Sequence, residues 1–111
     1  MLPVDFKDLS PIGTNAFPCF GAHYMQAPKQ NTPYAYALKV GIKKTEGVLD
    51  MLVKIPLSAY HKKKAKKLIE HLSNGSIPVT VAFKNIRCYQ HNFDGKLIIS
   101  ATADSFKIME D

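Results

Sequence analysis

The chain has 111 residues, of which 46% are hydrophobic and 22% are charged, and it carries a formal net charge of +6. This length and composition predict one soluble globular domain that buries a core without metals or disulfides. They exclude a membrane span, because no apolar run approaches the roughly 18 residues that one requires, and the basic excess favours an anionic partner, nucleic acid before a membrane surface.

The first third of the chain is rich in proline. Residues 1–33 contain five of the seven prolines, and we predict that residues 1–16 form an irregular N-terminal arm. Residues 17–25 carry enough aromatic side chains to predict a first strand, in which Pro18 and Gly21 indicate an edge position or a bend. The N-terminus has neither a basic start nor a sustained apolar stretch, so no secretory signal is apparent and a cytoplasmic location is the default.

Two strands joined by a short turn are predicted next. From Tyr34 to Lys43, large apolar side chains alternate with small or basic ones, which is typical of a half-buried strand. The same alternation runs from Val48 to Ile55, so the two segments predict a hairpin with its turn at residues 44–47. Pro56 ends the second strand.

An amphipathic helix is predicted to follow, with Ser58 as its N-cap. Apolar residues at 65, 68, 69 and 72 form one narrow stripe at helical spacing, and Asn74-Gly75 is a fitting stop signal. The polar side of the helix carries the densest charge of the chain, namely Lys62, Lys63, Lys64, Lys66 and Lys67. We interpret it as a solvated helix face, with electrostatic steering of a nucleic-acid backbone as the functional alternative.

Two further strands complete the predicted sheet. Residues 79–83 alternate, and the apolar positions then change phase to Ile86 and Cys88, which indicates a bulge near Asn85 where the strand bends. A polar hairpin loop at residues 89–95 is predicted to precede a last strand at residues 96–103. Residues 104–111 are predicted to be a short C-terminal tail.

The motifs do not predict catalysis. Cys19 and Cys88 lie far apart without CxxC or Cys/His ligand spacing, so zinc is not expected. They are expected to be buried thiols in a reducing compartment, the alternatives being a disulfide or a reactive thiol. The chain has no Gly-rich phosphate loop and no nucleophile elbow, and its four histidines are scattered. We therefore predict no catalytic residues, no metal site and no cofactor.

Basic and aromatic side chains coincide on the predicted strands. Single-strand binders need cations for phosphates and flat rings on which bases stack. Tyr34 and Tyr36 share the alternation of Leu38, so they belong either to the core or to a base-contacting surface. Tyr89, His91 and Phe93 fall in the polar loop, where the rings cannot all fold into the core, and we expect at least one of them to stack on a base.

The predicted element order, with the helix between strands three and four, is that of an OB fold. We therefore predict an all-β fold with one helix, a five-stranded OB-fold-like barrel over residues 1–111. Residues 79–86 (VTVAFKNI), the loop through Asp94-Gly95 and residues 96–107 (KLIISATADSFK) make the chain, over residues 17–107, resemble the small OB-fold single-stranded-DNA-binding proteins of phages, plasmids and other mobile elements.

This resemblance implies a non-enzymatic protein that binds single-stranded DNA, largely independently of sequence, during replication or transfer of such an element. A second copy of the chain or a replication protein is a further expected partner. The chain has no tryptophan and lacks a long acidic C-terminal tip, so recruitment of partners through its tail is not expected. The binding residues that the resemblance implies are Tyr34, Tyr36, Lys39, Lys43, Lys54, Lys84, Arg87, Tyr89, Phe93 and Lys96.

Two other functions fit the same sequence. An RNA-binding module would carry the same cations and rings, because the sequence alone does not distinguish recognition of DNA from recognition of a 2′-hydroxyl. A protein–protein adaptor or inhibitor would instead use the aromatic N-terminal region as an apolar patch, leaving the lysines to solvate the surface.

Overall fold

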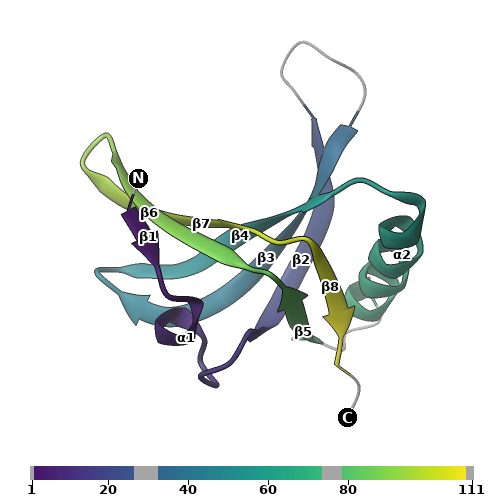
Figure 1. The fold of residues 1–111 in the computed structure, drawn as a ribbon, viewed down its shortest axis with the longest axis horizontal. Helices are drawn as coiled ribbons and strands as arrows, with labels where there is room; N and C mark the ends of the chain where they lie inside the picture. Colours follow the sequence, from purple (N-terminus) through teal and green to yellow (C-terminus); the bar gives the residue numbers. More distant parts are fainter. Residues whose placement is uncertain (1, 27–32, 74–78, 110–111) are drawn as a thin grey trace.

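The computed structural model describes residues 2–26, 33–73 and 79–109. Within these ranges the fold is mostly β, with two helices and eight strands (Figure 1). The elements are β1 (Leu2–Val4), α1 (Phe6–Leu9), β2 (Ala16–Gln26), β3 (Pro33–Thr45), β4 (Val48–Pro56), α2 (Ala59–Ser73), β5 (Val79–Lys84), β6 (Arg87–Phe93), β7 (Lys96–Thr102) and β8 (Ser105–Ile108).

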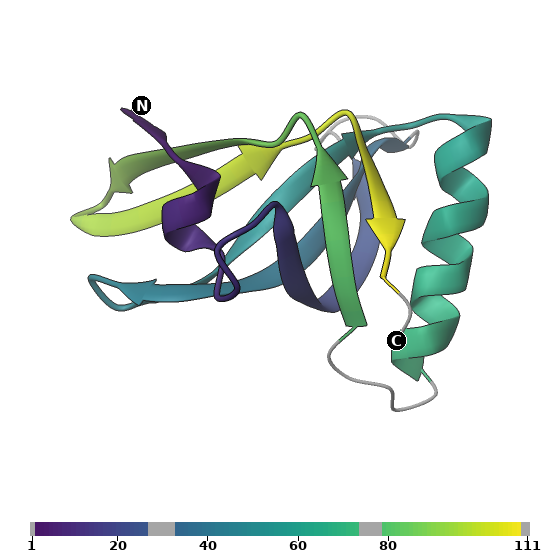
Figure 2. The same cartoon turned by 60° about the horizontal axis from the view of Figure 1, so that its bottom comes forward.

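All eight described strands belong to one sheet with the order β1-β6-β7-β4-β3-β2-β5-β8. The pair β4 and β7 is parallel, and the other neighbouring pairs are antiparallel. β5 and β6 follow each other in the chain, yet they pair towards opposite ends of this order, β5 with β2 and β6 with β7. The sheet is therefore strongly curled, as Figures 1 and 2 show.

The core follows the predicted alternation. Met51, Val53 and Ile55 of β4 are buried, whereas Leu52 and Lys54 between them are exposed. The buried side chains of β2, β3, β5 and β8 join them in one apolar cluster. Burying one such large side chain stabilises the fold by about 1.5–3 kcal/mol, which fixes the register of each strand, because a shift by one residue would expose the whole set.

Helix α2 packs on β2, β5 and β8, which are the last three strands in the strand order (Figure 2). Its apolar stripe places Ala65 and Leu68 in the core. Lys64 adds a polar tether, because its Nζ donates a hydrogen bond of 2.8 Å to the Phe106 carbonyl oxygen in β8. The predicted stop signal at residues 74–75 lies outside the described residues.

The two segments predicted to be irregular contain regular structure. Residues 1–16 include β1 and the one-turn helix α1, and the C-terminal tail includes β8. β1 pairs with β6 and β8 with β5, while α1 packs against β3. These elements are too short to show a periodicity, and their stability comes from the neighbours on which they pack.

The prediction of a polar loop at residues 89–95 was wrong. β6 continues to Phe93, which pairs directly with Lys96, so only Asp94 and Gly95 form the turn. Both turn residues have positive φ, 52° and 76°. This conformation matches the twist of a tight two-residue hairpin, so the strands pair up to the turn and the aromatic side chains of this segment stand on a strand.

The predicted bend near Asn85 is confirmed. β5 ends at Lys84 and β6 begins at Arg87, and Asn85 between them has a φ of 54°. Asn15 holds the strand just before the bend with two hydrogen bonds. Its side-chain Nδ2 donates to the Phe83 carbonyl oxygen, and its backbone carbonyl oxygen accepts from the Phe83 N–H at 3.1 Å.

Both cysteines are free and buried, as expected. Burial raises the pKa of the Cys19 thiol and of the Cys88 thiol to about 11, so both are protonated and unreactive at neutral pH. Of the helices in the described ranges, none has the length and apolar composition needed to cross a membrane.

Candidate nucleic-acid interface

The outward side chains of β3, β4, β7 and β6 form one continuous surface. Directly opposed residues on neighbouring strands point to the same side of a sheet. The register produces one row across the strands that contains Lys39, Leu52, Ser100 and Tyr89, and a second row that contains Lys54, Thr102 and Arg87. We call this surface the β4–β7 face and define it by Lys39, Leu52, Lys54, Arg87, Tyr89, Ser100 and Thr102.

A hollow of about 320 Å³ lies in this face. We call it the β4–β7 pocket, and its lining residues are Met25, Leu52, Lys54, Tyr89, Ser100, Ala101 and Thr102. Leu52 is 41% exposed although it lies in the middle of the sheet. The pocket therefore offers an apolar surface and a tyrosine ring that are open to solvent, with cationic side chains beside them.

Lys39 and Arg87 of the β4–β7 face have carboxylate partners. Lys39 Nζ lies 3.6 Å from Asp50 Oδ2, and Arg87 Nη2 lies 3.3 Å from Asp104 Oδ1. All four side chains are about half exposed. Exposed ion pairs of this kind contribute only about 0–1 kcal/mol, so a phosphate group can replace either carboxylate at small cost.

The Arg87 guanidinium is held in place from two sides. Its Nε donates a hydrogen bond of 3.2 Å to Thr102 Oγ1, and Asp104 accepts a second hydrogen bond of 2.8 Å from Asn85 Nδ2. The hydrogen bonds from Asn85 and Arg87 lower the pKa of the Asp104 carboxyl, so it is ionised at neutral pH. The bend after β5 thus positions a cation at the edge of the pocket.

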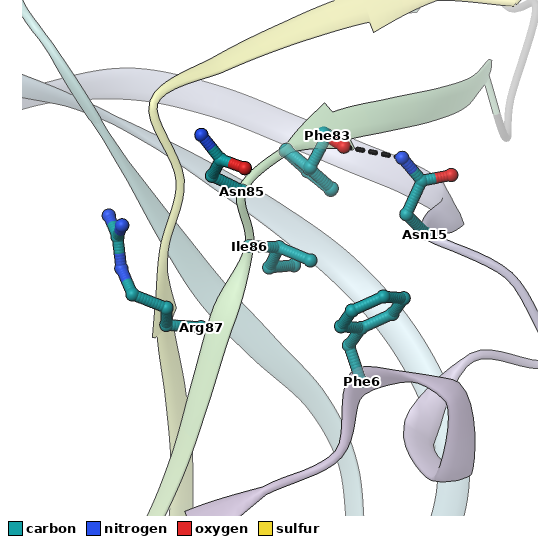
Figure 3. Close-up of a pocket in the computed structure, with 6 residues that line it drawn as sticks. All are labelled: Phe6, Asn15, Phe83, Asn85, Ile86 and Arg87. Atoms are coloured by element: carbon teal, nitrogen blue, oxygen red, sulfur yellow. Dashed lines mark hydrogen bonds between the residues drawn. The ribbon is translucent and has the colours of Figure 1, made fainter.

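A second hollow, of about 460 Å³, lies beside the same bend (Figure 3). Phe6 and Ile86 form its apolar side, and Asn15 points to the Phe83 carbonyl across it. The Arg87 side chain extends away from Phe6 in this view. Because its arginine is directed to Asp104 and Thr102, this hollow is a weaker candidate for anion binding than the β4–β7 pocket.

Phe20 is a ring that the sequence analysis did not assign to the site. It is 45% exposed and lies in a β-bulge of β2, between Cys19 and Gly21. A Cβ atom at Gly41 of β3 would lie only 2.8 Å from its Cε2 atom. Gly41 therefore allows the ring to lie against the outer side of β3, two residues from Lys39. In the sequence, Phe20 and the strand glycine Gly41 are separate features. Only the register of β2 with β3 shows that they lie together.

Six of the ten predicted binding residues share one side of the sheet. Lys39, Lys54, Arg87 and Tyr89 belong to the β4–β7 face. Phe93 has the same alternation as Tyr89, and it pairs with Lys96 at the end of the β6–β7 hairpin. Phe93 is 64% exposed and lies roughly 13 Å along β6 from Tyr89, at about 3.3 Å per residue.

The other four predicted residues lie elsewhere or are not described. Lys43 is exposed near the β3–β4 turn, and Lys84 is exposed on β5, where it pairs with Ser105 of β8. Tyr36 is only 4% exposed, and its ring packs 5.1 Å from that of Tyr24, so it belongs to the core. Burial, together with the neighbouring Tyr24, raises the pKa of Tyr36. The side chain of Tyr34 lies outside what the structure describes.

The lysines of α2 are arranged differently. Lys62, Lys63, Lys66 and Lys67 are exposed, whereas Lys64 is half-buried and attached to β8. Lys64 Nζ also lies 5.8 Å from the centre of the Phe106 ring, which is itself buried. Among the side chains that the structure describes, the aromatic partner of Lys64 is therefore part of the core.

Comparison with protein-family models, with curated proteins and with solved structures found no significant match. Among the described residues, no three His, Cys, Asp or Glu side chains lie close enough together to hold a metal ion.

Proposed function

We propose that this protein is a non-enzymatic, cytoplasmic protein that binds single-stranded nucleic acid, DNA in preference to RNA, through the β4–β7 face. The observation that carries the proposal is the cross-strand register. It surrounds the half-exposed Tyr89 ring and the exposed Leu52 with Lys39, Lys54 and Arg87.

This arrangement supports binding of a single strand because it supplies the two groups that such binding needs. The cations attract phosphates by releasing counterions, and Tyr89 offers a flat face to an unpaired base. Phe20 and Phe93 provide further exposed rings beside the lysines of the hairpins. A duplex hides its base faces, so the rings favour a single strand.

We also propose that the sheet is an OB-like five-stranded arrangement, in which β5 and β6 act as one bent strand. The supporting pairings are β2 with β3, β3 with β4, β4 in parallel with β7, β7 with β6, and β5 with β2. With β5 and β6 joined across residues 85–86, these five pairings form a circuit in which the helix follows the third strand. In OB folds the second and third strands, here β3 and β4, contribute to the oligonucleotide-binding surface.

The resemblance to single-stranded-DNA-binding proteins of phages, plasmids and other mobile elements supports DNA as the substrate and replication or transfer of such an element as the process. An RNA-binding module is the second form of the same proposal. A protein–protein adaptor is the alternative function, since Phe17 of the aromatic N-terminal region is fully buried but Phe20 and Tyr24 of the same region are exposed.

A fluorescence anisotropy titration tests the proposal. Labelled single-stranded DNA of mixed sequence, RNA of the same sequence and the corresponding duplex DNA would each be titrated with the protein at low and at high salt. We expect the single-stranded DNA to bind most tightly, and its affinity to fall as salt rises, by about 0.7 decades per decade of salt for each phosphate contact.

Three outcomes would contradict parts of the proposal. Absence of binding to every nucleic acid at low salt would overturn it. Tighter binding of the RNA would show that RNA, and not DNA, is the preferred ligand. Preference for the duplex would exclude the β4–β7 face as a base-stacking surface, because the tyrosine ring has no unpaired base to contact there.

A further inference from the structure

One wall of the β4–β7 pocket is apolar and includes an aromatic residue. Met25 of β2 and Leu52 of β4 contribute apolar surface, and the aromatic residue Tyr89 lines the hollow with them. At about 320 Å³, the hollow is at the small end of the range of ligand sites, roughly 300–1,000 Å³. The hollow therefore suits a small, partly apolar group, and a planar one can stack on the Tyr89 ring.

The polar groups of the pocket are predominantly hydrogen-bond donors. Thr102 Oγ1 accepts the 3.2 Å hydrogen bond from Arg87 Nε, and its own O–H can donate to an acceptor in the pocket. The Lys54 ammonium, which also lines the pocket, has donors only. Ser100, beside them on β7, adds a hydroxyl that can donate or accept.

These features match the edge of one base better than the others. Thymine presents a carbonyl acceptor at O4 next to its C5 methyl group, whereas adenine and cytosine present an amino donor at the equivalent position. Guanine also presents acceptors, at O6 and N7, but it is larger and has no methyl group for the apolar side chains to contact. A donor-rich rim beside apolar side chains therefore suits the thymine edge. We propose that the β4–β7 pocket receives one base of the bound strand and prefers thymine, with Thr102 and Ser100 as the specificity-determining residues. This inference rests on the proposed function and adds a base preference to it.

The preference is tested with oligomers of one base each, all of equal length, at one salt concentration. We expect deoxythymidine oligomers to bind about fourfold more tightly than deoxyuridine oligomers, which is the effect of burying one methyl group. We expect them to bind about tenfold more tightly than deoxycytidine oligomers, because the cytosine amino group would face a donor.

Variants of the two hydroxyl residues separate a base-reading role from a structural one. Thr102→Val and Ser100→Ala should bring the affinities for thymidine and cytidine oligomers to within about threefold of each other, since each removes one polar contact. Ser105→Ala on β8 is the matched control, because it removes a hydroxyl that lies outside the pocket, and it should keep the wild-type ratio. Leu52→Ala should reduce the ratio between thymidine and deoxyuridine oligomers.

The outcomes distinguish this inference from the function on which it rests. Equal binding of all oligomers by the wild-type protein, or an unchanged ratio in both Thr102→Val and Ser100→Ala, would overturn the base preference. The proposed function would still stand if Tyr89→Ala weakened binding. Absence of binding to any oligomer would overturn both. Ser100→Ala gives a second, smaller change in case Thr102→Val lowers the melting temperature.

Discussion

The β4–β7 face and the exposed face of α2 are both basic, but they differ in what surrounds the charges. On α2 the lysines follow one another along a solvated helix surface, and the ring that Lys64 contacts among the described residues, Phe106, is buried. On the β4–β7 face fewer cations lie around an accessible tyrosine and an exposed leucine. Charge density alone attracts a polyanion, whereas charges arranged around a ring can also hold its bases.

The largest expected effect comes from removing equal charge from the two regions. The triple variant Lys39→Ala, Lys54→Ala and Arg87→Ala should lose affinity for single-stranded DNA on the order of 100-fold or more at 50 mM salt, because about two counterions fewer are released. The variant Lys62→Ala, Lys63→Ala and Lys66→Ala has the same net charge and should lose clearly less. Titrations at several salt concentrations measure both. Equal losses would show that net charge, and not the β4–β7 face, determines binding.

Removal of the central ring has the next largest effect. Tyr89→Ala should weaken binding by about 1–3 kcal/mol, the contribution of one base stacked on an aromatic side chain. Tyr24→Ala is the matched control, since Tyr24 is also exposed, at 47%, but packs on Tyr36 and not in the pocket. Anisotropy titrations give the affinities, and thermal melts establish that both variants are folded. A loss confined to Tyr24→Ala would place the binding surface elsewhere.

Lys64 should separate stability from binding. Lys64→Ala removes the hydrogen bond to the Phe106 carbonyl and should lower the free energy of unfolding by roughly 1 kcal/mol, while the affinity for DNA changes little. Lys63→Ala, an exposed neighbour, is expected to leave stability within about 0.5 kcal/mol. Urea unfolding curves compare the two. If Lys64→Ala weakened binding as strongly as Tyr89→Ala, the helix would belong to the site.

Gly41 provides a smaller perturbation of the face. Gly41→Ala places a methyl group 2.8 Å from Phe20 Cε2, so the exposed ring has to turn away from β3. If Phe20 stacks on a base, affinity should fall by roughly 1 kcal/mol. Gly21→Ala is the control, because its new methyl group would meet the Lys39 Cβ at an ordinary 4.0 Å. Unchanged affinity in Gly41→Ala would remove Phe20 from the interface.

Asp104 should have the smallest effect, confined to acid conditions. Hydrogen bonds from Asn85 and Arg87 lower its pKa in the folded protein below its ordinary value of 3.8. The carboxylate therefore favours folding above pH 3.8, and this contribution disappears as the pH falls through the lower folded pKa. Asp104→Asn should make stability less dependent on pH in this range, as measured by urea unfolding between pH 5 and 2.5. A pH dependence equal to that of the wild-type protein would contradict this account.

The long strands could be predicted from the sequence because each has a clear period. The alternation in residues 34–43 and 48–55 and the stripe at 65, 68, 69 and 72 indicated β3, β4 and α2, although Ile69 of this stripe is 40% exposed. The change of phase after Phe83 indicated the bend. The short elements β1, α1 and β8 were missed, since segments of three or four residues have too few positions to show a pattern. The segment at residues 89–93 was predicted to be a loop because polar residues lie between its aromatic ones. It is the end of strand β6, since the turn takes up only Asp94 and Gly95.

The sequence by itself determined which side chains are available and which side of each strand they occupy. It supplied the cations, the rings and the alternation that separates Leu52 and Lys54 from the core. Only the tertiary structure decided which of them meet. The parallel pairing of β4 with β7 and the turn at Asp94-Gly95 place Tyr89 beside Leu52, while Tyr36 is buried against Tyr24. Pairing between distant strands depends on the packing of the whole core, and no local pattern encodes it.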